Sequence, residues 1–208
     1  PNFVSHWRIT LIASSLNPIA YYLILFNAYE LLPAQVAMSI NYSWAIVLTL
    51  MAIVFLKQKV LMADWVAAFA CYGGVFVIAT GGSVESFKGV GYVGLSLALL
   101  STVIWAGYWT LNIVDERESI IGLTLNFTVA LPVTGSICAV FSDLSINNTG
   151  LLAATYVGFI EMAIAFVLWS IALKTTENVS RVSNLIFLSP LLSLIIINKL
   201  LGEAIMPQ

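Results

Sequence analysis

Charged side chains are scarce in this sequence: they make up 9% of its 208 residues, and the formal net charge is −2. A soluble domain carries about 25% charged residues because its surface must be hydrated, so a soluble fold is excluded. No basic run is present that could bind nucleic acid. Hydrophobic residues make up 61% of the chain, which predicts that it lies in a lipid bilayer.

Histidine and cysteine are scarce as well. His6 is the only histidine, which excludes a cluster of histidines around a metal ion within one chain. Cys71 and Cys138 both lie in apolar runs, where nothing resembles a metal site or a redox pair. No Ser/His/Asp set is visible, and the glycines form no phosphate-binding loop. The sequence therefore predicts neither an enzyme nor a bound cofactor.

Long apolar runs take the place of the missing charge. A membrane-spanning helix needs about 20 mostly apolar residues, and these runs lack the strict alternation of barrel strands. We therefore expect an all-α integral membrane protein with a single transmembrane domain over residues 1–208. The seven expected spans cover residues 9–31, 34–56, 63–81, 89–113, 119–142, 150–173 and 180–201.

The basic residues predict the orientation of these spans, because cytoplasmic loops collect Lys and Arg. If the first span starts in the cytoplasm, Lys88 and Lys199 lie on the outer side. The other six of the eight basic residues then lie on the cytoplasmic side: Arg8, Lys57, Lys59, Arg117, Lys174 and Arg181. We expect the first span to run from the inside to the outside.

An internal repeat links the two ends of the chain. Aligned without gaps at an offset of 145, residues 21–60 lie over residues 166–205, and each stretch is a span, a polar corner and a second span. Five spans separate equivalent helices. Because five is odd, the two copies are expected to have opposite orientations in the membrane. Many secondary transporters build a site at the bilayer midplane from such inverted repeats.

The second copy carries sequence motifs that resemble a known family. They are the stretch Ala165 to Leu173, which ends in Ala-Leu, the stretch Val182 to Leu192 with its Pro190-Leu191 pair, and the closing Leu201-Gly202-Glu203. This copy resembles the EamA branch of the drug/metabolite transporter superfamily. The first copy matches less closely, because Trp44 stands where the family often has Pro.

The resemblance implies a fold of ten helices arranged as two inverted five-helix halves. On that pattern the seven spans correspond to helices three to nine, so we expect the chain to be a fragment. Residues 1–81 would be the end of the first repeat and residues 89–208 most of the second. The resemblance also implies a secondary transporter that exports amino acids or related small metabolites, coupled to protons, across a bacterial-type inner membrane.

Glu161 is the first candidate for a functional side chain. It lies in the middle of the span over residues 150–173, with no other charge within ten residues on either side. An ionised carboxylate at that depth is costly and usually faces a cavity or relays protons. We expect Glu161 to bind a proton or a substrate amine. The alternative is a protonated side chain that serves packing alone.

Four polar or aromatic residues of the fourth span share one helical face. Ser101, Trp105, Tyr108 and Asn112 follow one another at spacings of four, three and four. This face can hold an apolar or aromatic ligand by stacking, with hydrogen bonds from Asn112. The alternative is an aromatic contact between helices.

Further candidates lie in the first, second and seventh spans. Asn17, Pro18 and Tyr21 cluster near the centre of the first span, where Pro18 removes a backbone donor and can break the helix. Asn41 and Asn184 occupy nearly equivalent places in the two copies. Each can contact a ligand or hold two helices together, and the second use is the commoner one.

A membrane sensor is the alternative to the transporter. Seven spans with Lys199 in the last one are compatible with a rhodopsin-like sensor, since retinal binds a lysine. Lys199 lies near the end of its span, however, and no acidic counter-ion lies in the core of the third. The expected partners are therefore a small-molecule substrate, protons and the lipid bilayer, but no nucleic acid; the oligomeric state and the identity of the substrate are left open.

Overall fold

The computed structural model describes residues 6–82, 84–142, 144–145 and 147–201. The regular elements of these residues are all helical. The Gly202-Glu203 pair of the sequence motif lies outside the described residues. The chain forms two compact units, residues 1–22 with 108–176 and residues 23–107 with 177–208. Helices α2 (Tyr21–Leu31) and α6 (Tyr92–Val114) each continue from one unit into the other.

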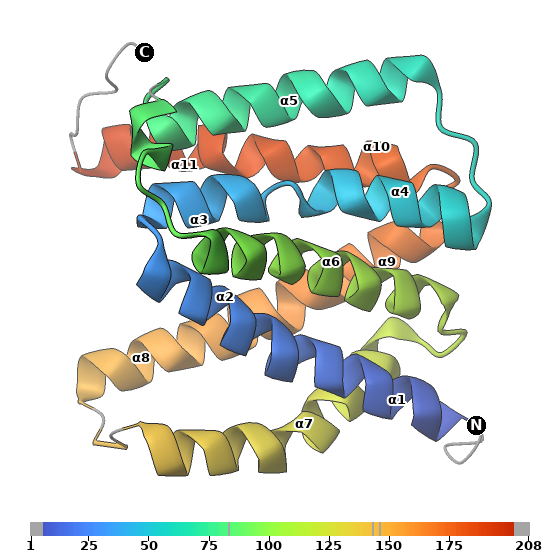
Figure 1. Cartoon of the computed structure of the whole chain (residues 1–208). Coiled ribbons are helices and arrows are strands. Elements are labelled where there is room, and N and C mark those ends of the chain that lie inside the picture. The colour runs from blue at the N-terminus through green and yellow to red at the C-terminus, as the bar shows by residue number, and fades with distance from the viewer. Residues whose placement is uncertain (1–5, 83, 143, 146, 202–208) are drawn as a thin grey trace. The chain divides into compact units, whose positions relative to one another are not determined.

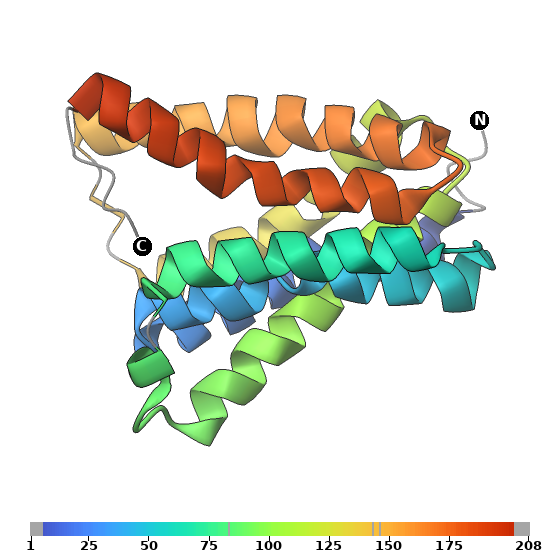
Figure 2. The same ribbon diagram turned by 90° about the horizontal axis from the view of Figure 1, so that it is seen from above.

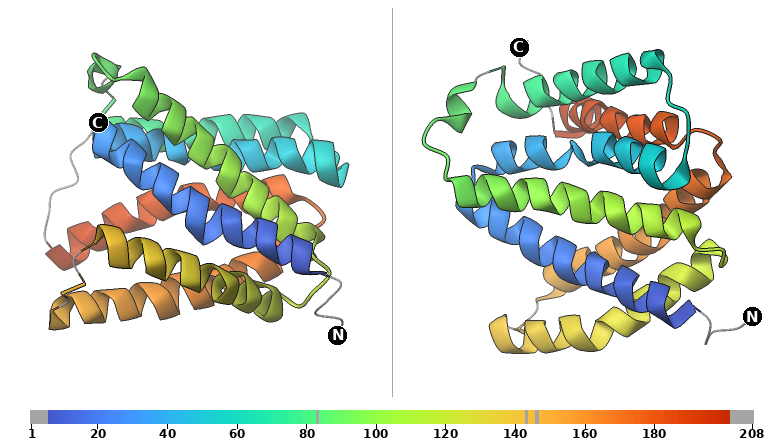
Figure 3. Two further views of the ribbon diagram at one scale, coloured as in Figure 1. Left: turned by 60° about the horizontal axis from the view of Figure 1, so that its bottom comes forward. Right: turned by 45° about the vertical axis from the view of Figure 1, so that its right-hand side comes forward.

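Unit 1, which comprises residues 1–22 and 108–176, is built around the first, fifth and sixth expected spans. Helices α1 and α7 pack together, and α7 also contacts η2 and α9. Figure 3 shows α7 lying beside the long helix formed by α8, η4 and α9. The elements of this unit, besides its parts of α2 and α6, are α1 (Trp7–Ser14), η2 (Ser15–Ala20), α7 (Ser119–Phe141), α8 (Asn148–Tyr156), η4 (Val157–Ala165) and α9 (Phe166–Thr175).

Unit 2, which comprises residues 23–107 and 177–208, contains the remaining spans. Helix α5 packs against α3 and α10, and α10 packs closely on α4 (Figures 1 and 2). The elements of this unit, besides its parts of α2 and α6, are α3 (Ala34–Asn41), α4 (Trp44–Leu56), α5 (Met62–Thr80), η3 (Val84–Phe87), α10 (Val179–Asn184), η5 (Leu185–Phe187) and α11 (Leu188–Leu201).

The predicted spans agree with the observed helices. Among the described residues, six helical segments are long and apolar enough to cross a bilayer. The seventh predicted span, residues 180–201, is helical from Val179 to Leu201. The six segments are Trp7–Leu31, Ala34–Leu56, Met62–Thr80, Tyr92–Val114, Ser119–Phe141 and Asn148–Thr175.

The distribution of apolar side chains is that of a protein solvated by lipid. Large hydrophobic residues such as Phe159, Val140 and Phe141 are exposed. The buried positions between helices are rich in alanine and serine instead. Small residues let helix backbones approach closely. In a bilayer the hydrophobic effect does not drive helices together, so they associate through such close packing. The chain is therefore an integral, multi-pass membrane protein.

The internal repeat is visible in the helix boundaries. A π-helical segment ends at Ala20, directly before the first copy, and another ends at Ala165, directly before the second, and an α-helix follows each at once. Helices α3 and α10 begin at positions that are again 145 apart. The helix that begins with α3 is interrupted at Tyr42–Ser43, and the helix that begins with α10 is interrupted at Leu185–Phe187. Matching interruptions in dissimilar sequences support the offset found by alignment.

Candidate functional site

The helix of the first span breaks at Asn17, as its proline predicts. Asn17 has φ −143° and ψ 125°, which is an extended conformation inside a membrane-spanning helix. Pro18 explains the break, because a proline disfavours helical geometry in the residue before it and supplies no N–H of its own. The Asn17 side chain is fully buried. Irregular backbone at this depth is tolerated only inside the protein or beside a water-filled cavity.

Three amide side chains converge on the hydroxyl of Tyr108 in unit 1. Asn17, Asn112 and Asn126 each lie within interaction distance of this hydroxyl, and all four residues are buried. Asn112 also donates from Nδ2 to the Tyr108 carbonyl at 2.8 Å. Yet both amide atoms of Asn17, and Oδ1 of Asn126, make no hydrogen bond of normal geometry to any residue in the described ranges. These four residues are called the amide cluster below.

Glu161 lies on the π-helical segment η4 and its side chain is exposed. It interacts electrostatically with Tyr22, and Tyr22 interacts in turn with Tyr108 of the amide cluster. A π-helical turn inside an α-helix is uncommon and is often found at functional sites. The only carboxylate deep in a described span of unit 1 therefore lies on an irregular stretch of helix and interacts electrostatically with Tyr22.

Aromatic rings from α6, α7 and α9 pack together in unit 1. The ring of Trp109 meets the rings of Phe166 and Trp169 edge-on, at centroid distances of 5.4 and 6.5 Å. Phe127 of α7 packs at 6.1 Å from Phe166. Edge-to-face pairs of this kind fix ring positions, so they form a firm apolar wall in unit 1. Tyr21, which was predicted to be a site residue, is buried and packs edge-on against Tyr22 at 5.1 Å.

An ion pair closes the end of unit 1 where α6 connects to α7. Arg117 binds Asp115 through Nε at 2.9 Å from each carboxylate oxygen and through Nη2 at 2.6 Å from Oδ2. Its Nη1 donates to Thr10 Oγ1 on α1 at 2.7 Å. Lys174 donates to the carbonyls of Asp115 and Arg117, at 2.7 Å each. The connection thereby joins α1, α6, α7 and α9.

The charge state of Asp115 follows from these contacts. Burial raises the pKa of its carboxyl, but the hydrogen bonds and positive charge of Arg117, with the charge of Lys174, lower it further than burial raises it. The pKa of Asp115 therefore lies below its usual value. Its carboxylate is ionised at neutral pH and neutralises the guanidinium beside it.

Two other predicted site residues bridge helices within unit 2. Asn41 on α3 donates from Nδ2 to Ser101 Oγ on α6 at 3.0 Å. Trp105, one turn further along α6, meets Trp44 edge-on at 6.3 Å. Through these contacts Asn41 and Trp105 hold helices together, and a role for either side chain in ligand binding stays a prediction. The predicted face of α6 is buried at all four of its positions, with partners from unit 2 at one end and from unit 1 at the other.

Asn184 lines an apolar cavity of about 330 Å³ in unit 2, between α5 and the start of α11. Its Nδ2 donates weakly to the Asp64 carbonyl at 3.4 Å. Its Oδ1 is buried and has no hydrogen-bond partner among the described residues. Cys71, Gly74 and Phe187 belong to the same lining, so Asn184 is the one carboxamide in an otherwise apolar wall.

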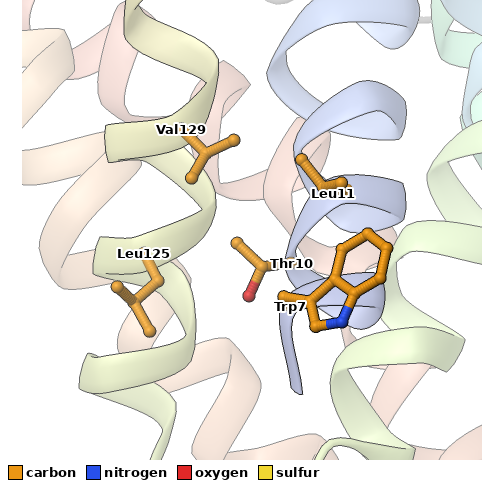
Figure 4. Close-up of a pocket in the computed structure, with 5 residues that line it drawn as sticks. All are labelled: Trp7, Thr10, Leu11, Leu125 and Val129. Carbon is orange, nitrogen blue, oxygen red and sulfur yellow. The ribbon is translucent and has the colours of Figure 1, made fainter. Parts of the chain in front are cut away.

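Two more cavities lie in unit 1 and are mostly apolar. The cavity in Figure 4, of about 310 Å³, has Thr10 as its one polar side chain besides the indole of Trp7. Its other lining residues, Leu11, Leu125 and Val129, come from α1 and α7 and face one another across it. The second cavity, of about 440 Å³, lies between α7 and η4. Such surfaces suit lipid chains better than a polar solute.

The structure brings some predicted site residues together and separates others. Asn17, Tyr108 and Asn112 meet in the amide cluster, whereas Glu161 interacts electrostatically with Tyr22. Asn41, Trp105 and Asn184 belong to unit 2. Sequence analysis missed Asn126, Tyr22 and the Asp115–Arg117–Lys174 contacts. Asn126 had a usable signal, because it is a carboxamide in the middle of an apolar span.

Comparison with known proteins adds a family and a fold. Residues 1–80 and 92–208 match the model of the EamA-like transporter family. A solved structure described only as "Crystal structure of protein" superposes with a TM-score of 0.81 at 19% sequence identity, covering 96% of this chain and 71% of its own. That likeness concerns the fold alone. No curated protein sequence matches the chain. The family match favours a transporter over the seven-helix sensor.

Proposed function

This chain belongs to the EamA-like transporter family, and from that premise we propose that it exports a small metabolite, such as an amino acid or a related compound, in exchange for protons. The membrane is a bacterial-type cytoplasmic membrane, and the ends that carry Arg117 and Lys174 lie in the cytoplasm. One observation carries the proposal: Glu161 lies at mid-span on a π-helical segment and interacts electrostatically with Tyr22.

The mechanism is alternating access between the two inverted copies. Each copy is preceded by a π-helical segment and has an interruption in its second helix, and helices bend at such irregular stretches. A proton on Glu161 changes the relative stability of the inward-open and outward-open states. Substrate binding changes the same equilibrium, and this shared equilibrium couples the two fluxes.

Transport measurements in proteoliposomes test this proposal. Amino acids, nucleosides and amphipathic cations are offered to the full-length protein with and without a pH gradient. Glu161→Gln should abolish the acceleration by the gradient, because the amide takes up no proton, and should leave counterflow of substrate in place. Glu177→Gln, in an exposed connection, is the matched control and should behave as the wild type.

Each outcome has a definite meaning. A pH response that is intact in Glu161→Gln contradicts proton coupling at this residue. Loss of both the pH response and counterflow assigns Glu161 to substrate binding instead. If none of the three classes is transported by a monodisperse protein, the proposed substrate class is wrong.

A further inference from the structure

An apolar cavity in unit 2 lies next to a group of charged side chains. The cavity, of about 330 Å³, lies between α5 and the start of α11, and its wall includes Cys71, Gly74, Leu188 and Leu191. Pockets that bind small ligands typically have volumes of about 300–1,000 Å³. Asn184 of α10 belongs to the same wall and is its carboxamide. The cavity can therefore hold an apolar chain and has one polar boundary.

Asp64, a buried carboxylate in the first turn of α5, connects this boundary to an arginine. Arg181 of α10 donates from Nε to Asp64 Oδ1 at 2.9 Å. Asn178 Nδ2 and the backbone N–H of Leu61 donate to Asp64 Oδ2, at 3.0 and 3.1 Å. Asn184 Nδ2 donates to the Asp64 carbonyl at 3.4 Å. Hydrogen bonds to one residue thus join Arg181 to the wall of the cavity.

The guanidinium of Arg181 is held at one nitrogen and is open at the other two. The side chain is 62% exposed, whereas that of Asp64 is 7% exposed. Of its guanidinium nitrogens, only Nε has a partner in the part of the chain that the structure describes. A guanidinium presents its donors as a planar fork that matches the oxygens of a phosphate. Because Asp64 fixes Nε, the two terminal nitrogens are already oriented for an anion.

Two lysines lie close to these contacts. Gln58 Oε1 accepts from the backbone N–H of Val179 at 2.9 Å, which places the connection from α4 to α5 beside the first residue of α10. Lys57 and Lys59 flank Gln58 and are exposed. Neither forms an ion pair with a carboxylate in the described ranges. They therefore add uncompensated positive charge next to the start of α10.

The charge balance of this region favours an anion. Three basic side chains, Lys57, Lys59 and Arg181, stand against two carboxylates, Asp64 and Glu177, which leaves a net charge of +1. These five residues are called the charged corner below. In the proposed orientation the charged corner lies on the cytoplasmic side. The anionic lipids of that leaflet attract Lys and Arg at the membrane surface.

We propose that unit 2 binds one anionic phospholipid of the cytoplasmic leaflet, with its phosphate on Arg181 and part of an acyl chain in the cavity behind Asn184. A soluble anion would use only the charged corner, and an uncharged lipid would use only the cavity. A phospholipid with a negative head group uses both. The inference goes beyond the transport proposed above: it uses the orientation of the spans but not the coupling at Glu161.

The two cysteines of the chain provide a direct assay. Both are exposed, but Cys71 lines the cavity whereas Cys138 lies on α7 in unit 1. The full-length protein in detergent is treated with N-ethylmaleimide, and peptide mass spectrometry measures the alkylation rate of each thiol. Phosphatidylglycerol should slow the alkylation of Cys71 and leave that of Cys138 unchanged. Phosphatidylcholine with the same acyl chains should need an about tenfold higher concentration, because its head group has no net negative charge.

Two neighbouring glycines of α5 give matched variants for the cavity. Gly74 lines it and Gly73 does not, and a Cβ on either residue would meet nothing within 4 Å. Native mass spectrometry measures the affinity of each variant for phosphatidylglycerol. Gly74→Leu should lower this affinity by about tenfold, because the leucine takes the place of the acyl chain. Gly73→Leu should match the wild type, and equal affinities of the two variants would overturn the place given to the chain.

Variants of the charged corner test the head group. Arg181→Gln should lower the affinity for phosphatidylglycerol by about tenfold, to that for phosphatidylcholine. Arg8→Gln removes an exposed arginine from unit 1 and should leave both affinities unchanged. Because Arg181→Gln also removes the partner of Asp64, a second variant is needed. Lys57→Gln combined with Lys59→Gln keeps that ion pair and should lower the affinity for phosphatidylglycerol alone.

Three results would overturn the proposal. The first is an unchanged affinity for phosphatidylglycerol in both variants of the charged corner. The second is protection of Cys71 by glycerol phosphate, which has the head group without the chains. The third is a Cys71 that resists alkylation in the full-length protein stripped of lipid, because another segment of the protein would then fill the cavity.

Discussion

At the scale of single residues, the unusual feature of this chain is where its few polar groups lie. The ion pair of Arg117 with Asp115 is bidentate and nearly buried. Breaking such a pair by removing one partner is costly, because the other charge stays behind without compensation. The pair therefore supports the fold of unit 1.

Replacing Asp115 by asparagine should destabilise the protein by about 2–4 kcal/mol at neutral pH. The variant leaves Arg117 without its carboxylate and weakens the junction of α1, α6, α7 and α9. Unfolding in detergent, followed by circular dichroism, measures the loss. Glu118→Gln is the control, because Glu118 is exposed and caps α7 without a side-chain hydrogen bond. Equal stability of the two variants would contradict the role given to Asp115.

The same carboxylate predicts how stability depends on pH. The pKa of Asp115 is lower in the folded protein than in the unfolded chain. Its contribution is therefore complete above the unfolded value of about 4 and is lost as the pH falls through the lower folded value. The wild type should lose stability in this acid range, and Asp115→Asn should lose less. Parallel pH profiles for the two proteins would be inconsistent with this assignment.

At the scale of elements, close helix packing depends on single glycines. A Cβ built on Gly94 of α6 would lie 2.6 Å from Cδ2 and 2.8 Å from Cγ of the buried Leu32. The same atom on Gly107 of the same helix would meet nothing within 4 Å. The two positions therefore differ in packing while they share a helix and a residue type.

Gly94→Ala should lower thermal stability by about 1–3 kcal/mol, the usual cost of overpacking. Gly107→Ala should be neutral or slightly stabilising, because alanine favours a helix more than glycine does. Both variants are compared in one detergent by thermal unfolding. If Gly107→Ala destabilises as much as Gly94→Ala, the close approach of Leu32 is not the cause.

At the scale of the whole molecule, the proposed function requires the two inverted copies to move past each other. Helix α4 belongs to the first copy and α10 to the second, and they pack within unit 2. Thr49 Oγ1 donates to Ser180 Oγ across this contact at 3.2 Å. Small hydroxyl residues let two helices approach closely and hydrogen-bond to each other. The proposed alternating access places the relative motion of the two copies at this contact, which is called the α4–α10 seam below.

A disulfide across that seam should arrest transport. Thr49→Cys with Ser180→Cys is made in a chain whose Cys71 and Cys138 are replaced by serine. Oxidation should reduce transport by about tenfold or more, and a reductant should restore it, since the bond fixes the spacing of the two helices. Thr49→Cys alone should be insensitive to oxidation. Undiminished transport by the fully cross-linked protein would mean that α4 and α10 move as one body.

The sequence by itself determined that the chain lies in a lipid bilayer. It also determined where the spans begin and end and that the chain contains a repeat. These follow from local physics: a bilayer admits only backbone that is hydrogen-bonded within the segment, and apolar length fixes each span. The helix break at Asn17 was also predictable from local sequence, because Pro18 disfavours helical geometry in the residue before it. Glu161 was identified for the same reason, as a lone charge in an apolar run.

Only the tertiary structure decided which polar groups meet. Helical spacing placed Ser101, Trp105, Tyr108 and Asn112 on one face of α6, but their partners come from η2, α3, α4 and α7, which are distant in sequence. Asn126 joins Asn17 although 109 positions separate them. Spacing along a chain defines the face of a helix, whereas packing between helices determines what that face touches. The amide cluster therefore became visible only in the fold.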